Sequence, residues 1–104
     1  MRLNQSEGLR RSEEFNAEQS RRRSKQIEMM IAEFDRMCIE LGQQIEAEET
    51  RARINDPKHF AYPTYAKAAR ERRAKLQLSA AGLRFELDRL RFEANKAPGQ
   101  DVAA

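Results

Sequence analysis

Ile54-Asn-Asp-Pro-Lys-His-Phe-Ala-Tyr-Pro63 is the stretch of sequence that decides the fold. It contains two of the three prolines in the chain, Pro57 and Pro63. Proline lacks a backbone N–H and clashes with the preceding turn, so both residues are excluded from a helix interior but suit a first helical turn. Asp56, directly before Pro57, is a helix N-cap signal. We interpret this stretch as a bend between two long helices.

The composition indicates a single small unit built from helices that share one narrow apolar seam. Of the 104 residues, 36% are charged and 39% are hydrophobic, and there is no Trp. This is too little apolar surface for a globular core, and the mixture of Glu, Arg, Ala and Leu favours long helices. The predicted bounds are about 6–53 for helix 1, 54–63 for the bend, about 64–97 for helix 2 and 98–104 for a short disordered tail.

The net charge of +3 is unevenly shared between the two halves of the chain. Acidic residues slightly outnumber basic ones before the bend, and basic residues clearly outnumber acidic ones after it. The halves therefore suit each other as partners, whereas nucleic-acid binding calls for a concentrated basic face. The single cysteine rules out an internal disulfide, and no apolar run approaches the roughly 20 residues of a membrane span. Because the N-terminus also lacks the apolar core of a signal peptide, we expect the chain to be cytoplasmic.

Apolar residues recur at alternating steps of three and four on both sides of the bend. In the first segment the series is Ile27, Ile31, Phe34, Cys38, Leu41 and Ile45. In the second segment it is Leu76, Ala80, Leu83, Leu87, Leu90 and Ala94. This is the heptad pattern of a coiled coil, and we predict an all-α fold: an antiparallel two-helix coiled-coil hairpin with an overhanging N-terminal helix.

The charges predict how the two segments are aligned. We expect layers that pair Ile31 with Leu90, Phe34 with Leu87, Cys38 with Leu83, Leu41 with Ala80, Ile45 with Leu76, and Glu48 with Arg73. The same alignment places acidic residues of helix 1 opposite arginines of helix 2: Glu28 with Arg91, Asp35 with Arg84, and Glu49 with Arg70. Such pairs stabilise weakly but exclude other alignments. In this alignment Ser24 is the first residue of helix 1 that has a partner, and everything before it overhangs.

Few residues suggest chemistry. The sequence has no phosphate-binding glycine loop and no cluster with metal-ligand spacing, so we predict no catalysis, no cofactor and no metal. His59 lies in the bend, where we expect it to face solvent. Cys38 lies on the seam, where we expect a small core residue and no reactive thiol.

Two sets of residues are candidates for partner binding. The first is the basic triplet Arg21, Arg22 and Arg23, which is either a solvated helix face or a contact for a phosphate or an acidic partner. The second is a set spaced seven apart on the outer face of helix 2, away from the seam: Leu78, Phe85 and Phe92. Scattered surface apolar residues are common, but an apolar stripe on an outer face indicates a second contact. The bend also holds three aromatic residues, which we expect to cap the open end of the seam: Phe60, Tyr62 and Tyr65.

Several stretches resemble FliJ proteins of flagellated alphaproteobacteria, and the likeness covers about residues 15–90. They are Gln26-Ile-Glu-Met-Met-Ile-Ala-Glu-Phe-Asp-Arg-Met37, Ala47-Glu-Glu49, Asp56-Pro-Lys-His-Phe-Ala-Tyr-Pro-Thr-Tyr-Ala-Lys-Ala-Ala-Arg70 and Arg72-Arg73. The resemblance implies a coiled-coil component of the flagellar type III export apparatus that is similar to the central stalk of rotary ATPases. It also implies docking to the export ATPase complex, the export gate protein and export chaperones, at the inner face of the cell membrane. It implies no catalytic residues.

Two alternatives come from other classes of protein. The first is a nucleic-acid binder that uses the basic triplet together with Arg70, Arg72 and Arg73, although acidic residues are interleaved along both helices. The second is a self-assembling structural coiled coil, in which the outer residues of helix 2 close a dimer of hairpins.

Overall fold

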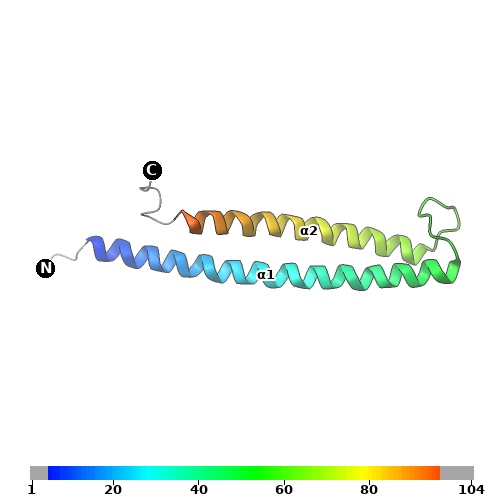
Figure 1. Ribbon diagram of the computed structural model, residues 1–104, viewed down its shortest axis with the longest axis horizontal. Helices are drawn as coiled ribbons and strands as arrows, with labels where there is room; N and C mark the ends of the chain where they lie inside the picture. Colours follow the sequence, from blue (N-terminus) through cyan, green and yellow to red (C-terminus); the bar gives the residue numbers. More distant parts are fainter. Residues whose placement is uncertain (1–4, 97–104) are drawn as a thin grey trace.

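The computed structural model describes residues 5–96, which form two long helices joined by a bend (Figure 1). Helix α1 spans Gln5–Ala52 and helix α2 spans Thr64–Asn95. The helices run antiparallel and lie side by side, so the chain is the all-α coiled-coil hairpin that the heptad pattern predicts. The predicted tail over 98–104 lies outside the described residues.

Helix α1 is much the longer element, and its N-terminal part projects beyond the end of α2 (Figure 1). A straight helix of this length extends roughly 70 Å. Every described side chain from residue 6 to residue 17 is exposed. The predicted N-terminal overhang is therefore present.

The core is a narrow seam between the helices, and most of its buried residues lie next to the bend. Ile27 is fully buried at the far end of the paired region, where it lies on the same seam as Leu87. The largest group of buried residues packs at the bend end: Leu41, Ile45, Tyr62, Ala66 and Ala69. Two of these five residues are alanines of α2, and the largest cluster of buried side chains lies next to the bend.

Helix α1 ends in a Schellman motif centred on Arg53. The backbone of Arg53 has φ 58°, in the left-handed region, and its N–H donates to the carbonyl oxygen of Thr50 at 3.3 Å. The N–H of Ile54 donates to the carbonyl oxygen of Glu49 at 3.2 Å, and the Ile54 side chain packs against the core at the bend. This pair of hydrogen bonds is the motif's signature. The helix thus ends before either proline is reached.

The bend consists of two successive turns. The Asp56 carboxylate accepts the N–H of Lys58 at 2.9 Å, and the Asp56 carbonyl accepts the N–H of His59 at 3.0 Å. Nδ1 of the exposed His59 accepts the N–H of Ala61 at 3.0 Å. The N-cap prediction for Asp56 is therefore wrong, because its side chain stabilises a turn. The N-cap of α2 is Pro63, which provides no side-chain hydrogen bond.

All three predicted ion pairs between the helices are present. Nη2 of Arg91 lies 2.9 Å from Oε1 of Glu28, Nη2 of Arg84 lies 2.6 Å from Oδ2 of Asp35, and Nη2 of Arg70 lies 2.9 Å from Oε2 of Glu49. These pairs follow one edge of the hairpin along its paired length. The three predicted ion pairs are therefore confirmed.

The apolar layers, in contrast, are displaced from the predicted alignment by about one heptad. Sγ of Cys38 lies 3.9 Å from the carbonyl oxygen of Arg73. Leu83, its predicted partner, is about 15 Å further along α2, so the pairing of Cys38 with Leu83 is wrong. The predicted pair of Glu48 with Arg73 is also wrong, because Glu48 binds Arg51 on its own helix at 2.6 Å.

The reason for this difference is the seven-residue repeat of the charged residues. Each residue along one edge of a helix lies between two edge residues of the other helix that are seven positions apart. The same charged pairs can therefore form in either of two alignments that differ by one heptad. The three ion pairs form in the displaced alignment for this reason, and charge matching alone could not tell the two alignments apart.

Candidate partner-binding surfaces

The basic triplet does not form one surface. Nη2 of Arg21 lies 2.7 Å from Oε2 of Glu18, and Nε of Arg22 lies 3.3 Å from Oε1 of the same carboxylate. The hydrogen bond from Arg21 and its positive charge, followed by the contribution of Arg22, hold the pKa of Glu18 below its ordinary value. Two exposed arginines thus share one acid on their own helix.

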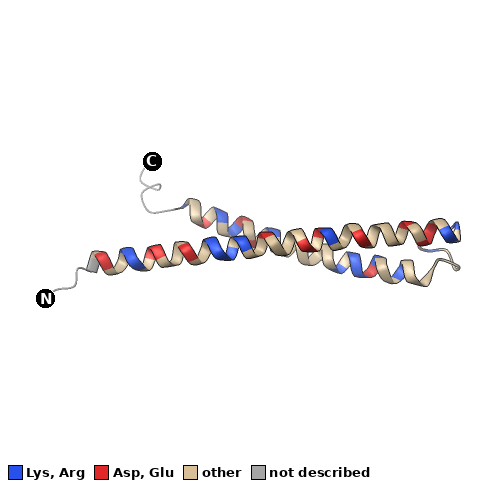
Figure 2. Ribbon diagram, turned by 90° about the horizontal axis from the view of Figure 1, so that it is seen from below, with Lys and Arg blue, Asp and Glu red and all other residues tan. Residues whose placement is uncertain are grey.

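Arg23 points in a different direction and joins the two helices. Its Nη2 lies 3.1 Å from Oε1 of Glu86 on α2. We assigned Arg23 to the overhang, and this assignment is wrong, because the displaced alignment extends the paired region further toward the N-terminus than Ser24. Figure 2 shows basic and acidic residues interleaved along the ribbons of both helices, with no long basic stretch.

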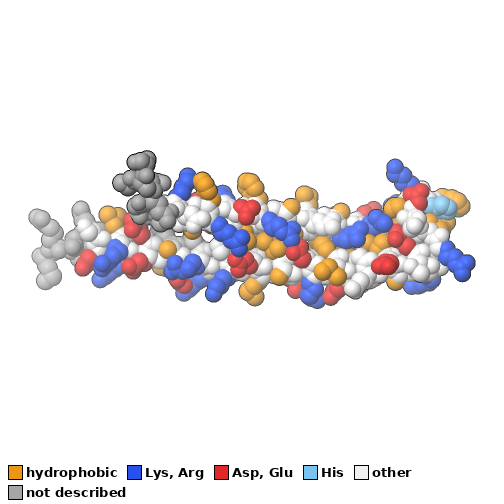
Figure 3. Space-filling model, viewed as in Figure 1, with side chains coloured by type: hydrophobic (Ala, Val, Ile, Leu, Met, Phe, Trp, Pro, Cys, Tyr) orange, Lys and Arg blue, Asp and Glu red, His pale blue; other side chains and the backbone are white. Residues whose placement is uncertain are grey.

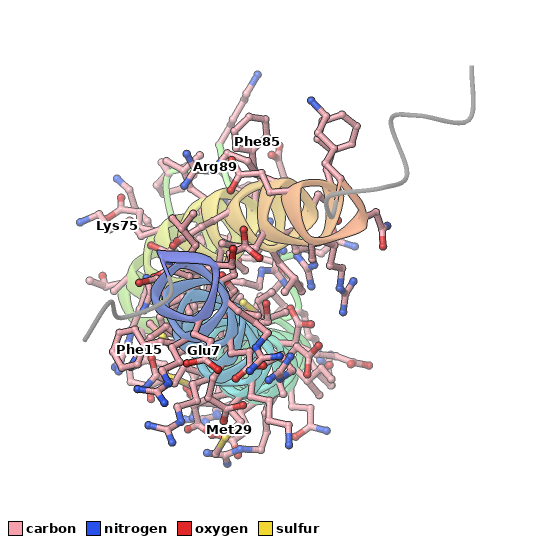
Figure 4. All side chains as sticks on the ribbon, turned by 90° about the vertical axis from the view of Figure 1, so that its left-hand side faces the viewer. Glu7, Phe15, Met29, Lys75, Phe85 and Arg89 are labelled. Carbon is pink, nitrogen blue, oxygen red and sulfur yellow. The ribbon has the colours of Figure 1, made fainter. Side chains whose placement is uncertain are left out.

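The predicted outer stripe, which we define as Leu78, Phe85 and Phe92, does face away from α1. Leu78 and Phe85 are each 76% exposed and Phe92 is 60% exposed. Hydrophobic side chains project at intervals from the edge of α2 that faces away from α1 (Figure 3). Viewed along the rod, Phe85 points outward from α2 (Figure 4). Nζ of Lys96 lies 4.5 Å from the centroid of the Phe92 ring, so a cation already contacts one end of the stripe.

Basic side chains accompany the outer stripe. Lys75 and Arg89 also project from the outer side of α2 (Figure 4). Within residues 5–96 neither of them forms an ion pair, in contrast to the arginines on the edge that faces α1. The outer face of α2 therefore combines exposed apolar side chains with positive charges that have no partner in the described chain.

A hydrogen-bonded cluster of Tyr62, Glu49 and Arg70 closes the bend. The Tyr62 hydroxyl donates to Oε2 of Glu49 at 2.7 Å, and Nε of Arg70 donates to the Tyr62 hydroxyl oxygen at 2.7 Å. These hydrogen bonds, first from Tyr62 and then from Arg70, lower the pKa of Glu49. Burial, and then the bond to Glu49, raises the pKa of Tyr62. Only the pair of Glu49 with Arg70 was predicted, because Tyr62 enters the cluster through the bend geometry.

The three aromatic residues of the bend have different environments. Tyr62 is 8% exposed and caps the seam as expected. Tyr65 is 58% exposed and its hydroxyl donates to Oε1 of Gln44 at 3.2 Å. Phe60 is 97% exposed and stacks on His59, with ring centroids 4.8 Å apart. The capping role predicted for Phe60 and Tyr65 is therefore wrong.

The described residues show neither a metal cluster nor a membrane-spanning helix. No group of three or more His, Cys, Asp or Glu side chains in residues 5–96 is arranged to hold a metal ion. Neither α1 nor α2 combines the length and apolar character needed to cross a membrane. Cys38 is partly buried on the seam, as expected.

These observations define an elongated antiparallel coiled-coil hairpin with exposed apolar side chains at its overhang, its bend and the outer face of α2. Comparison with protein-family models, with curated proteins and with solved structures gives no match to this chain.

Proposed function

We propose that this chain is a FliJ-like component of the flagellar type III protein export apparatus. In this proposal it is a non-catalytic coiled-coil rod that docks to the export ATPase complex, the export gate protein and export chaperones. It would be cytoplasmic and peripheral at the inner face of the cell membrane, at the flagellar base. Its action would be mechanical, since a stiff hairpin couples two bodies that it contacts at different points along its length.

The observation that carries the proposal is the agreement between the FliJ-like stretches and the closure of the bend. Glu49 lies in one stretch, and Tyr62 and Arg70 lie in another. Their side chains meet in one hydrogen-bonded cluster. The stretches that resemble the family thus contain the residues that hold the hairpin closed, which supports a shared rod architecture.

Binding to purified partners tests this proposal. The full chain, immobilised through its C-terminus, should retain the flagellar export ATPase or the cytoplasmic part of the export gate protein from the same bacterium. A strain that lacks the chain should lose motility, and the intact gene should restore it. Retention of neither partner, or full motility of the deletion strain, would contradict the proposal.

A nucleic-acid binder remains the alternative from another class, and the paired arginines argue against it. Arg21 and Arg22 share Glu18, while Arg23 and Arg70 each bind a carboxylate across the hairpin. Strong retention on heparin at physiological salt, with a steep salt dependence of DNA binding, would favour this alternative. Sedimentation of the purified chain tests the other alternative, a self-assembling coiled coil.

A further inference from the structure

The outer stripe on α2 has the spacing of a coiled-coil seam that has no partner in the hairpin. Leu78, Phe85 and Phe92 are seven residues apart and strongly exposed. Residues at this spacing lie two turns apart on one face of a helix, so they form a line parallel to the rod. A line of single apolar side chains is narrower than the apolar face of a helix that lies on a membrane, which covers more than about 100°. Its width suits one further helix.

Small residues lie between the large side chains of the stripe. Ala74, Ala81 and Gly82 are exposed on the same face. A Cβ atom built at Gly82 meets nothing within 4 Å. Small and large side chains therefore alternate along this face, as they do on a helix against which a second helix packs.

The charges on this face are arranged along the stripe. Three cations lie on one side of it: Lys75, Arg89 and Lys96. They occupy one heptad position, which recurs every seven residues and which holds Gly82 between Lys75 and Arg89. Within residues 5–96 none of the three cations forms an ion pair, and Lys96 contacts the Phe92 ring. Asp88 lies on the opposite side, in the groove that it lines with Glu28 and Arg91, and Glu71 lies on the line of the stripe, seven residues before Leu78. The side of the stripe that carries Lys75, Arg89 and Lys96 is thus positively charged.

We propose that the outer face of α2 docks an acidic amphipathic α-helix of a partner protein, packed along α2 on the side away from α1. The partner helix places apolar side chains around Phe85 and Phe92 and carboxylates toward Lys75 and Arg89. A second copy of this chain complements the face less well. In an antiparallel pair of α2 helices centred on Phe85, Lys75 of one copy faces Lys96 of the other, so like charges meet.

A selection experiment tests both the helical form and the charge of the partner. A displayed library of heptad peptides, with fixed leucines and with flanking positions randomised among Glu, Lys, Gln and Ser, is selected on the immobilised full chain. We expect enrichment of Glu at the flanking positions. The double substitution Phe85→Ser, Phe92→Ser should weaken binding of the selected peptides about ten-fold or more, since buried aromatic residues dominate helix docking. Lys75→Glu with Arg89→Glu should reverse the selection toward Lys.

The matched control is the double substitution Phe15→Ser, Met29→Ser on α1. These two side chains are as exposed as the stripe, and they project from α1 on a different side of the rod from Phe85 (Figure 4). This variant should bind the selected peptides as the unchanged chain does. Circular dichroism should show native helix content for both double variants, because all four side chains lie outside the seam.

Three results would overturn the proposal. The first is a failure of the binding tests: either the selected peptides show no preference for Glu, or the double substitution Phe85→Ser, Phe92→Ser leaves their binding unchanged. The second is a dimer in sedimentation that this double substitution dissociates, which would assign the stripe to a second copy. The third is co-sedimentation with phosphatidylglycerol vesicles that the same substitution abolishes, which would assign it to a lipid surface. The inference depends on this face alone, so failure of the flagellar proposal leaves it standing.

Discussion

At the scale of single residues, the hairpin depends on a few side chains around the bend. Arg53 ends α1 in a left-handed conformation that costs a residue with a side chain about 1 kcal/mol or more. Tyr62 joins Glu49 to Arg70 across the two helices. Neither feature follows from the heptad pattern, because each depends on how the chain turns between the helices.

Arg53→Gly should stabilise the hairpin. Glycine adopts the left-handed conformation without strain, which lowers the free energy of the folded chain. This effect exceeds the opposing effect of glycine's larger conformational entropy in the unfolded chain. We expect the free energy of unfolding to increase by up to about 1 kcal/mol in urea denaturation. Arg51→Gly is the control: it lies in the last turn of α1 and should destabilise by about 1 kcal/mol. Equal destabilisation by both substitutions would contradict the Schellman motif.

Tyr62→Phe should destabilise the hairpin by about 1 kcal/mol, because a partly buried hydroxyl that donates one hydrogen bond and accepts another is removed. Tyr65→Phe removes a hydroxyl that bonds Gln44 on the exposed surface and should cost clearly less. Thermal melting of the two variants side by side measures the difference. A larger loss for Tyr65→Phe would show that the cluster at the bend does not stabilise the fold.

Lowering the pH should decrease the stability of the hairpin through protonation of Glu49. Its pKa is lowered in the folded chain from a reference value of 4.5, mainly by the hydrogen bonds from Tyr62 and Arg70. A carboxyl group whose pKa is lower in the folded chain stabilises the fold at pH values above its pKa in the unfolded chain. This stabilisation is lost as the pH falls through the pKa of the folded chain. The melting temperature should therefore decrease as the pH is lowered below about 4.5. Glu49→Gln should flatten this decline more than Glu46→Gln; the same pH dependence in both variants would contradict the assignment.

At the scale of the elements, the helices contain glycines that weaken them where the packing has room for a methyl group. A Cβ atom at Gly82 meets nothing within 4 Å, and one at Gly42 lies 3.4 Å from Nη1 of Arg73. Gly82→Ala should therefore stabilise by about 1 kcal/mol, and Gly42→Ala by somewhat less, because the Arg73 side chain must shift. Urea denaturation of both variants checks the order. Loss of stability in Gly82→Ala would contradict an open outer face on α2.

Much of the element structure could be predicted from the sequence. The heptad spacing and the two prolines of the bend are local signals, so they indicate both helices and their separation. The charge matching predicts the pairs of Asp35 with Arg84 and Glu28 with Arg91, which are present. The layers could not be predicted in the same way, because a long arginine reaches a carboxylate from either of two alignments one heptad apart.

The candidate surfaces could be predicted only in part. The spacing of Leu78, Phe85 and Phe92 places them on one outer face without knowledge of the fold, and their exposure agrees with this. The direction of Arg23 depends on which residue of α2 lies opposite it, so its contact with Glu86 needed the alignment. The exposure of Phe60 depends on the two turns of the bend, for which its sequence position gives no signal.

At the scale of the whole molecule, the chain is a slender rod whose core is one seam and whose remaining surface is available for contacts. The overhang of α1, the bend with Phe60 and the outer stripe of α2 lie at separate positions along this rod. Such a shape suits a protein that joins partners, as the proposed function requires. The contacts between the helices, including that of Arg23 with Glu86, depend on the two helices folding back on each other in the alignment that brings Cys38 beside Arg73.

Disulfide trapping measures this alignment most directly, because Cys38 is the single cysteine of the chain. A second cysteine is introduced on α2 as Leu76→Cys or, in a separate variant, as Leu83→Cys, and each chain is oxidised under dilute conditions. We expect Leu76→Cys to form an intramolecular disulfide rapidly and Leu83→Cys to form none, since Leu83 lies about 15 Å from the Arg73 backbone along α2. Faster crosslinking at Leu83→Cys, or none in either variant, would contradict the hairpin as described.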